Sequence, residues 1–198
     1  MTEQEKIDAG LIWNDSPEIL EEQRIAKEML YDFNMSRPSE NDLRNQIIKK
    51  MFNVCGENVW INQPLTLCRG KTISIGHDCY FNSGTTFVDD AKVTIENYVK
   101  FGPNVTICTT GHPLSPEHRF DGMYSFPINI KDNVWIGAGA IVLAGVTIGE
   151  NTVIGAGSVV TKDIPANVIA VGSPCKVMRE LNDHDKEFYF RDHKLVNT

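Results

Sequence analysis

From about residue 59 onward the sequence repeats with a period of six residues. Without interruption, aliphatic residues stand six apart at Ile130, Ile136, Val142, Ile148, Ile154 and Val160. Upstream the period is looser, with a two-residue slip between the runs Ile75, Phe81, Phe87 and Ile95, Phe101, Ile107. An α-helical stripe would need spacings of three and four. The fixed period therefore predicts a repeat architecture rather than helices or a hairpin meander.

The period has a direct structural meaning. Neighbouring strand residues point to opposite faces, so one aliphatic residue in every six indicates a short strand followed by a bend. The Gly and Asn residues between them permit the tight or left-handed backbone that a bend needs. Three bends close a triangular coil, and stacked coils place the aliphatic residues in ladders down the middle. We therefore expect a mainly β protein built as a parallel β-helix.

The first third of the chain has helical spacing instead. Asp15-Ser16-Pro17-Glu18 predicts a helix start, and Arg37-Pro38 predicts its end. The apolar face of this helix would carry Ile19, Ala26, Met29, Leu30 and Phe33. Ser39 and Asp42 have the spacing of a capping box for a second helix, whose apolar stripe would be Leu43, Ile47 and Met51.

One long segment interrupts the six-residue period. Between Thr109 and Asn129 no repeat unit fits, and the segment is rich in Pro, Gly and His. Irregular loops on a rigid scaffold commonly carry chemistry. We expect the coil to end at Asp163-Ile164-Pro165. The expected organisation is a helical segment at 1–58, a β-helix domain at 59–180 with a projecting active-site loop at 109–129, and a tail at 181–198.

Charge and composition exclude several classes of function. The net charge is −7, and an acidic chain has no general attraction for nucleic acid or an anionic membrane. The N-terminus lacks the basic start and apolar run of a signal peptide. Five cysteines, an odd number with no C-x-x-C pair, argue against disulfides and a zinc knuckle. We therefore expect a cytoplasmic protein with reduced thiols.

At this point the sequence resembles a known family. The six-residue repeat is similar to that of the hexapeptide-repeat acyltransferases, which fold as left-handed parallel β-helices and usually form trimers. Five segments resemble the galactoside O-acetyltransferase branch: Val88–Asp90, Thr110–Pro113, Met123–Pro127, Asn133–Gly137 and Gly155–Pro165. The likeness extends over nearly the whole chain, and the Gly111–Pro113 loop with Tyr124–Pro127 and the tail at Phe188–Asp192 favour the galactoside type over the maltose type. The resemblance implies transfer of an acetyl group from acetyl-CoA to a sugar hydroxyl, the 6-hydroxyl of a hexopyranoside, in a homotrimer with active sites between subunits.

His112 is the catalytic residue that the resemblance implies. A neutral imidazole suits a proton acceptor near neutral pH, and His112 lies in the irregular loop between Gly111 and Pro113. Without the family motif, a solvated turn histidine would be the better interpretation. The implied mechanism is direct transfer in a ternary complex, with backbone N–H groups, that of Ala138 among them, stabilising the oxyanion.

The resemblance also implies residues for both substrates. For the acceptor these are Asp15, Asn82, Asp90 and Met123, together with Cys68, which stands where the galactoside pattern has a hydroxyl residue. Arg24 lies near a matching arginine, but its spacing to Tyr31 is one residue short. For acetyl-CoA the residues are Trp135, Ala138, Ala156, Thr161, Lys162, Lys176 and Arg179. Lys176 replaces an expected arginine, which keeps the charge and loses the bidentate fork.

Several alternatives remain open. Asn82 can be a coil-corner residue, Asp90 a solvated acid, Met123 a loop-packing residue and Trp135 a core residue. The acceptor can be maltose, glucose or another small hydroxyl compound. A β-helix that only binds partners is a non-catalytic alternative. A zinc carbonic anhydrase would need three histidines, for which His77, His112 and His118 are the available set; their spacing does not fit that family, and no metal is expected.

Overall fold

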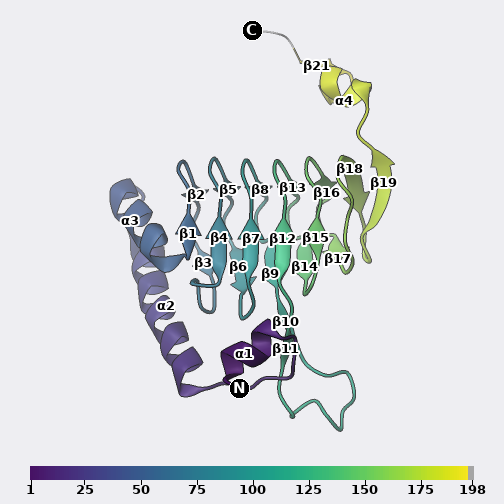
Figure 1. The fold of residues 1–198 in the computed structure, drawn as a ribbon. Helices are drawn as coiled ribbons and strands as arrows, with labels where there is room; N and C mark the ends of the chain where they lie inside the picture. Colours follow the sequence, from purple (N-terminus) through teal and green to yellow (C-terminus); the bar gives the residue numbers. More distant parts are fainter. Residues whose placement is uncertain (196–198) are drawn as a thin grey trace.

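The body of the molecule is a coil of three parallel sheets. The computed structural model describes residues 1–195. Figure 1 shows the rungs stacked side by side, with the two longer N-terminal helices at one end and the C-terminal segment at the other. Sheet I has the order β1-β4-β7-β12-β15, sheet II the order β2-β5-β8-β13-β16-β18-β19, and sheet III the order β3-β6-β9-β14-β17. This is the left-handed parallel β-helix expected from the sequence.

The strands are short, as the six-residue period predicts. Sheet I contains β1 (Val54–Cys55), β4 (Ile73–Ile75), β7 (Val93–Ile95), β12 (Ile128–Ile130) and β15 (Thr147–Ile148). Sheet II contains β2 (Trp60–Ile61), β5 (Tyr80–Phe81), β8 (Lys100–Phe101), β13 (Trp135–Ile136), β16 (Val153–Ile154), β18 (Val168–Val171) and β19 (Lys176–Glu180). Sheet III contains β3 (Leu65–Thr66), β6 (Thr85–Val88), β9 (Thr106–Cys108), β14 (Ile141–Leu143) and β17 (Val159–Val160).

The repeat residues form the core. All six residues of the uninterrupted series, from Ile130 to Val160, have no exposed surface, and those of the looser upstream series are at most 1% exposed. Ile130 pairs with Ile148, Ile136 with Ile154, and Val142 with Val160. The aliphatic ladders predicted from the sequence are thus confirmed, and their burial away from water is the main force that holds the rungs together.

Two of the three edges of the coil keep a constant length. Six residues separate consecutive core positions across the edge between sheets I and II and across the edge between sheets II and III, as in Ile75, Phe81 and Phe87. All of the irregularity falls on the edge between sheets III and I, which we call edge III/I. The two-residue slip from Phe87 to Ile95 and the long loop from Ile107 to Ile130 both lie there.

The edge between sheets I and II is built from left-handed residues. Asn133, Asn151 and Asn167 all have φ near +60° (58°, 59° and 60°). Asparagine tolerates this conformation better than most residues. The amide of Asn133 donates to Asn151, and that of Asn151 donates to Asn167. The turns are therefore joined from one rung to the next.

Three helices precede the coil: α1 (Glu3–Asp8), α2 (Pro17–Met35) and α3 (Asn41–Met51). The predicted start of α2 is confirmed, because the Ser16 side chain caps the helix and Pro17 begins it. The predicted capping box of α3 is wrong. Glu40 occupies the cap without a side-chain hydrogen bond, since its carboxylate instead accepts from the backbone N–H of Arg37. Leu43 of the predicted stripe is also 44% exposed.

The coil continues beyond the predicted end at Asp163–Pro165. Ile164 forms a parallel bridge with Ile148, and β18 adds to β16 in parallel. β19 then turns back antiparallel to β18. The tail holds α4 (Asp183–Glu187) and the hairpin of β20 (Phe188–Phe190) and β21 (His193–Lys194). Within residues 1–195, no helix is long and apolar enough to cross a membrane.

Candidate active site at one edge of the coil

The projecting loop leaves edge III/I through a short hairpin. β10 (Thr110–Gly111) pairs antiparallel with β11 (Tyr124–Ser125), and residues 112–123 form the loop between them. A Cβ atom on Gly111 would collide with the Tyr124 hydroxyl, so only glycine allows this close approach. Figure 1 shows the loop projecting beyond the coil beside α1.

His112 is the first residue after β10. Its side chain is exposed and makes no hydrogen bond to any residue of the described part of the chain. The imidazole is therefore accessible to a ligand, while its backbone is fixed by the Thr110–Ser125 and Gly111–Tyr124 pairs. This is the arrangement that a proton acceptor for a bound substrate needs.

Asp89 lies in the turn of edge III/I between β6 and β7, which together with the adjoining base of the loop we call the corner. It has no exposed surface. Its carboxylate accepts from the backbone N–H groups of Cys68, at 2.7 Å, and of Arg69 and Gly70. It also accepts from the hydroxyl of Thr72 at 2.6 Å. These bonds satisfy both oxygens of a buried side chain, so the two-residue slip in the repeat contains a structural carboxyl group.

Asp90, the predicted acceptor-binding acid, is 5% exposed. The hydroxyl of Thr110 donates to its Oδ2 atom at 2.6 Å. Burial raises the pKa of Asp90, and the hydrogen bond from Thr110 opposes that rise. The predicted alternative, a solvated loop acid, is therefore wrong for Asp90.

Other predicted acceptor residues lie around the same corner. Cys68 is half-buried, and burial raises the pKa of its thiol to about 11, so it is present as a neutral thiol near neutral pH. Met123 exchanges two backbone hydrogen bonds with Trp13 and packs against the cluster of Ile7, Trp13, Ile19 and Ala91. Asp15 is exposed, and its charge contributes to the raised pKa of Asp90.

Two residues of this corner were not predicted. Arg69 is only 4% exposed, and its guanidinium binds Glu22, Gln4 and the backbone carbonyl of Asp90. Trp13 has no exposed surface, and its indole N–H donates to the hydroxyl of Ser125 at 3.0 Å. In the sequence, Arg69 could have been noticed as a lone arginine inside the β-helix repeat. No local sequence pattern marks Trp13.

Asn82 lies on a different edge from Asp90 and His112. It follows β5, on the edge between sheets II and III, which we call edge II/III, and its side-chain oxygen accepts from the N–H of Ser83. The four-residue strand β6 separates it from Asp90. At ~3.3 Å per residue that strand alone spans about 13 Å. One chain therefore does not bring Asn82 together with the other predicted acceptor residues.

The predicted acetyl-CoA residues divide between the same two edges. Ala138 and Ala156 are exposed and stacked on edge II/III, where Gly157 donates to the carbonyl of Ala138. Trp135 lies on the outer face of β13 and is 56% exposed, so the core alternative for it is wrong. Thr161 and Lys162 are exposed on edge III/I, directly after β17.

Lys176 and Arg179 lie on β19. Lys176 is exposed, opposite Val171. Arg179 is already engaged, because two of its nitrogens each donate to Asp185 at 2.6 Å. A phosphate at Arg179 would have to compete with this carboxylate. Arg24, the residue with the uncertain register, pairs with Glu21 on the exposed face of α2.

The histidines do not form a metal site in the described residues. No group of three or more His, Cys, Asp or Glu side chains is placed to hold a metal ion there. His77 instead contacts Asp78, and His118 contacts Asp121. All five cysteines are free.

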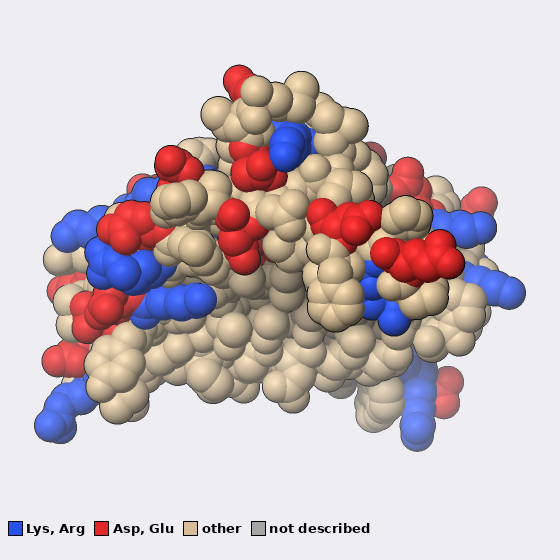
Figure 2. Space-filling view, turned by 90° about the horizontal axis from the view of Figure 1, so that it is seen from below, with Lys and Arg blue, Asp and Glu red and all other residues tan. Residues whose placement is uncertain are grey.

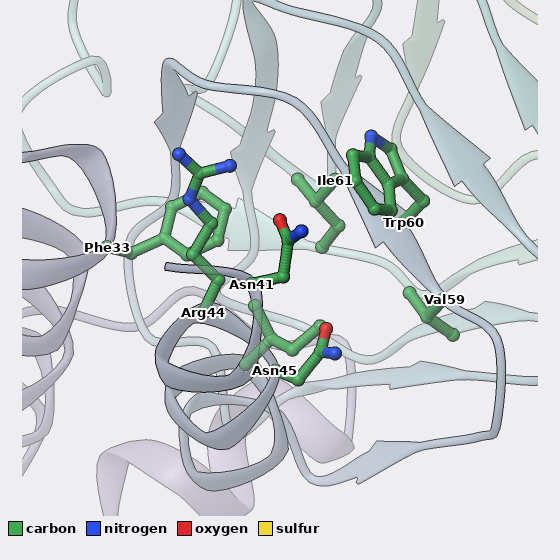
Figure 3. Close-up of a pocket in the computed structure, with 8 residues that line it drawn as sticks. Phe33, Asn41, Arg44, Asn45, Val59, Trp60 and Ile61 are labelled. Carbon is green, nitrogen blue, oxygen red and sulfur yellow. The ribbon is translucent and has the colours of Figure 1, made fainter. Parts of the chain in front are cut away.

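Surface shape adds two observations. Figure 2 shows charged side chains across the upper part and at both ends of this view, with a broad uncharged surface in the lower middle between them. A small cleft between α3 and the first rung is lined by Asn41, Arg44, Val59 and Trp60, among others (Figure 3). None of the predicted site residues lines that cleft.

Two family models match the chain. The bacterial transferase hexapeptide model, of six repeats, matches residues 127–162. The maltose acetyltransferase hexapeptide capping motif matches residues 6–56. The matches fall on the part with the strict period and on the helices that cap the coil.

Similar proteins share nearly the full length of the chain. A galactoside O-acetyltransferase of Escherichia coli is 51% identical over 98% of this chain and 97% of its own. One from Lactococcus lactis is 44% identical over 93% of this chain and 90% of its own. Among solved structures, a galactoside acetyltransferase in complex with coenzyme A has a TM-score of 0.97 at 49% identity, with all of both chains covered. A maltose O-acetyltransferase of Clostridium difficile has a TM-score of 0.90 at 38% identity, covering 92% of this chain and 99% of its own.

Proposed function

Because the chain belongs to the hexapeptide-repeat O-acetyltransferase family of the galactoside and maltose enzymes, we propose that it transfers the acetyl group of acetyl-CoA to a hydroxyl group of a galactoside-type sugar, in the cytoplasm. Acetyl-CoA-dependent O-acetylation is the activity of this family, and the relatives span the whole chain. The single observation that carries the sugar assignment is the corner of Asp90, Thr110 and His112, where an exposed imidazole follows a buried carboxylate.

The proposed mechanism is direct transfer in a ternary complex. His112 takes the proton from the acceptor hydroxyl, and the oxygen attacks the thioester carbonyl. The C–S bond then breaks, and the CoA thiolate takes a proton back from His112. Asp90 orients the sugar, whose 6-hydroxyl is the reacting group. The backbone N–H of Ala138 donates to the oxyanion.

A site between two subunits completes this proposal. Residues for one reaction lie on two edges of the coil, with Asn82, Ala138 and Ala156 on edge II/III and Asp90, His112 and Lys162 on edge III/I. Sheet III between these edges presents an uncharged row on its outer face: Thr66, Thr86, Thr106, Ile141 and Val159. Packing this face against a neighbouring copy can place one edge of each kind side by side. A homotrimer closes such contacts in a ring.

The roles of the remaining residues follow from this geometry. Cys68 and Met123 wall the acceptor pocket, and Asp15 approaches it from the start of α2. Trp135 packs along the pantetheine arm. Thr161, Lys162, Lys176 and Arg179 meet the polar and phosphate end of CoA, where Lys176 offers a point charge rather than a fork.

The experiment that tests the activity is thiol release from acetyl-CoA with a panel of acceptors. The panel holds a galactoside, a thiogalactoside, maltose, glucose, serine and chloramphenicol. We expect turnover with the galactosides and the highest kcat/KM among them. Turnover with maltose or glucose alone would assign the maltose branch. Binding of acetyl-CoA without turnover of any sugar would contradict the proposed acceptor class.

A further inference from the structure

Asp90 is the end of a buried chain of hydrogen bonds. The indole N–H of Trp13 donates to the hydroxyl of Ser125 at 3.0 Å. The hydroxyls of Ser125 and Thr110 are 2.8 Å apart, and that of Thr110 donates to Oδ2 of Asp90 at 2.6 Å. Trp13 and Ser125 have no exposed surface.

The chemistry of the two ends fixes the direction of the whole chain. An indole N–H can only donate, and an ionised carboxylate can only accept. The hydroxyl oxygen of Ser125 therefore accepts the hydrogen bond from the Trp13 N–H, and Ser125 turns its own hydroxyl hydrogen toward Thr110. Thr110 in turn directs its hydrogen to Asp90. Each hydrogen bond polarises the next, so the last one is stronger than it would be alone.

The second carboxylate oxygen of Asp90, Oδ1, is available to a ligand. No described residue donates a hydrogen bond to Oδ1 of Asp90. Every buried side-chain oxygen of the described residues has a hydrogen-bond partner. Because Oδ1 has none, it must reach the surface. Holding Oδ2 from inside leaves Oδ1 in a fixed direction toward a ligand. We propose that Trp13, Ser125 and Thr110 are positioning residues, a one-way hydrogen-bond relay that keeps the Asp90 carboxylate fixed for the acceptor hydroxyl.

The charges around Asp90 make the relay necessary. Burial, the neighbouring Asp89 and the approaching Asp15 all raise the pKa of Asp90, while Arg69 lowers it. Arg69 is itself shared with Glu22, and Lys92 lines the same cavity as these groups. Cys68 beside Asp90 is a neutral thiol. Donation from Thr110 is the one side-chain hydrogen bond among the described residues that opposes this rise at the carboxylate itself.

The relay also connects two distant parts of the chain. Trp13 and Ser125 are 112 residues apart in sequence, and they belong to the segment before α2 and to the base of the loop that carries His112. Backbone hydrogen bonds between Trp13 and Met123 hold the same contact. Replacing the indole by a phenyl ring therefore removes the N–H while the backbone bridge stays.

The test compares four variants. Thr110→Val removes the last donor, Ser125→Ala the middle one and Trp13→Phe the first, while Thr110→Ser keeps the hydroxyl. Ile19→Val is the matched control, because Ile19 packs in the same cluster as Trp13 without a hydrogen bond to the relay. Each variant is assayed for the KM of the acceptor, the KM of acetyl-CoA and the acid limb of the pH profile of kcat/KM. The titration of Asp90 is also followed by ¹³C NMR in Asp-labelled protein without acceptor.

We expect Thr110→Val to raise the acceptor KM about tenfold, as for loss of a hydrogen bond to a charged group, and to leave the KM of acetyl-CoA unchanged. Trp13→Phe should raise the acceptor KM roughly two- to threefold, because it acts through two intervening bonds. In both, the acid limb and the Asp90 titration move to higher pH, since a donor to the charged form is lost. Thr110→Ser, which keeps the hydroxyl, should leave the acceptor KM, the acid limb and the Asp90 titration close to those of wild type.

The relay is rejected if Trp13→Phe and the control Ile19→Val show the same Asp90 titration and the same acid limb of kcat/KM. It is also rejected if acetyl-CoA and acceptor KM rise together in Thr110→Val, which would indicate a general distortion. Although the relay rests on the proposed function, the two can fail separately. The NMR titration decides the relay even if no sugar in the panel is turned over.

Discussion

Asp89 and Asp90 are neighbours in sequence, yet their carboxylates are held by different parts of the chain. Asp89 accepts from the backbone of Cys68, Arg69 and Gly70 and from Thr72, all on the preceding rung. Asp90 accepts from Thr110, at the base of the loop. One carboxylate therefore closes the coil, and the other is available to a ligand.

This difference predicts opposite effects of the same substitution. Asp89→Asn replaces one of two acceptor oxygens by an NH₂ group that can only donate, and should lower the free energy of unfolding by roughly 3 kcal/mol. Asp90→Asn should cause no comparable loss of stability and should raise the acceptor KM. Urea unfolding and steady-state kinetics of both variants check this. Equal loss of stability in the two variants would contradict the assignment.

The raised pKa of Asp90 predicts a pH dependence of stability. Because burial raises the pKa in the folded state above the ordinary value of 3.8, the unfolded chain releases this proton first as pH rises. The contribution of Asp90 to the free energy of unfolding therefore declines from about pH 4 upward, through the folded pKa. Asp90→Asn should lack this decline. Urea titrations of wild type and variant at about pH 4 to 7 should diverge, with the variant gaining relative stability; parallel curves would exclude the effect.

His112→Ala should lower kcat by ~10²–10⁴-fold, the usual contribution of a general base, while the Kd of acetyl-CoA is unchanged. His118→Ala is the control, since His118 lies in the same loop, is exposed and contacts Asp121. It should keep wild-type kcat. Full activity in His112→Ala would mean that another group takes the proton.

Mixed oligomers test the proposed site between subunits. His112→Ala and Asn82→Ala change opposite edges of the coil, so each homotrimer should be impaired at all sites. In a mixed trimer, one interface joins an intact His112 to an intact Asn82. Randomly reassembled equal mixtures should recover about a quarter of wild-type activity, from the symmetry of a ring of three. No recovery after confirmed subunit exchange would place both residues in the site of one chain.

Gly111→Ala should reduce activity more than stability. The added Cβ would collide with the Tyr124 hydroxyl, which forces apart the two strands that carry His112. Adding Tyr124→Ala makes room and should recover part of kcat relative to Gly111→Ala alone. If the double variant is no better than the single one, the contact is not the cause.

The coil was predictable from the sequence, because burial in a β-helix repeats at every rung. Each of the positions from Ile130 to Val160 is buried for the same reason, so the pattern is visible without neighbours in space. The start of α2 was equally local, since Ser16 and Pro17 act within one turn. The capping box of α3 was not, because Glu40 was drawn to the N–H of Arg37 instead.

The arrangement of the site was only partly predictable. The family motifs indicated which residues to consider, but the repeat does not state on which edge each would lie. The partners of Asp90 and Arg69 come from distant segments, as the contacts of Arg69 with Gln4 and Glu22 illustrate. Arg179 was predicted to meet phosphate, and its pairing with Asp185 depends on the fold of the tail.

Two edges of the coil have a constant length, and only edge III/I varies in length from rung to rung. Asparagine side chains join the turns at the edge between sheets I and II, so an inserted residue there would break a contact with both neighbouring rungs. Edge III/I already carries the two-residue slip and the long loop while the core ladders continue unbroken. New recognition loops can therefore be added at this edge, beside Asp90, without moving the strands, and relatives of this scaffold can acquire different acceptors by changing the length of one corner alone.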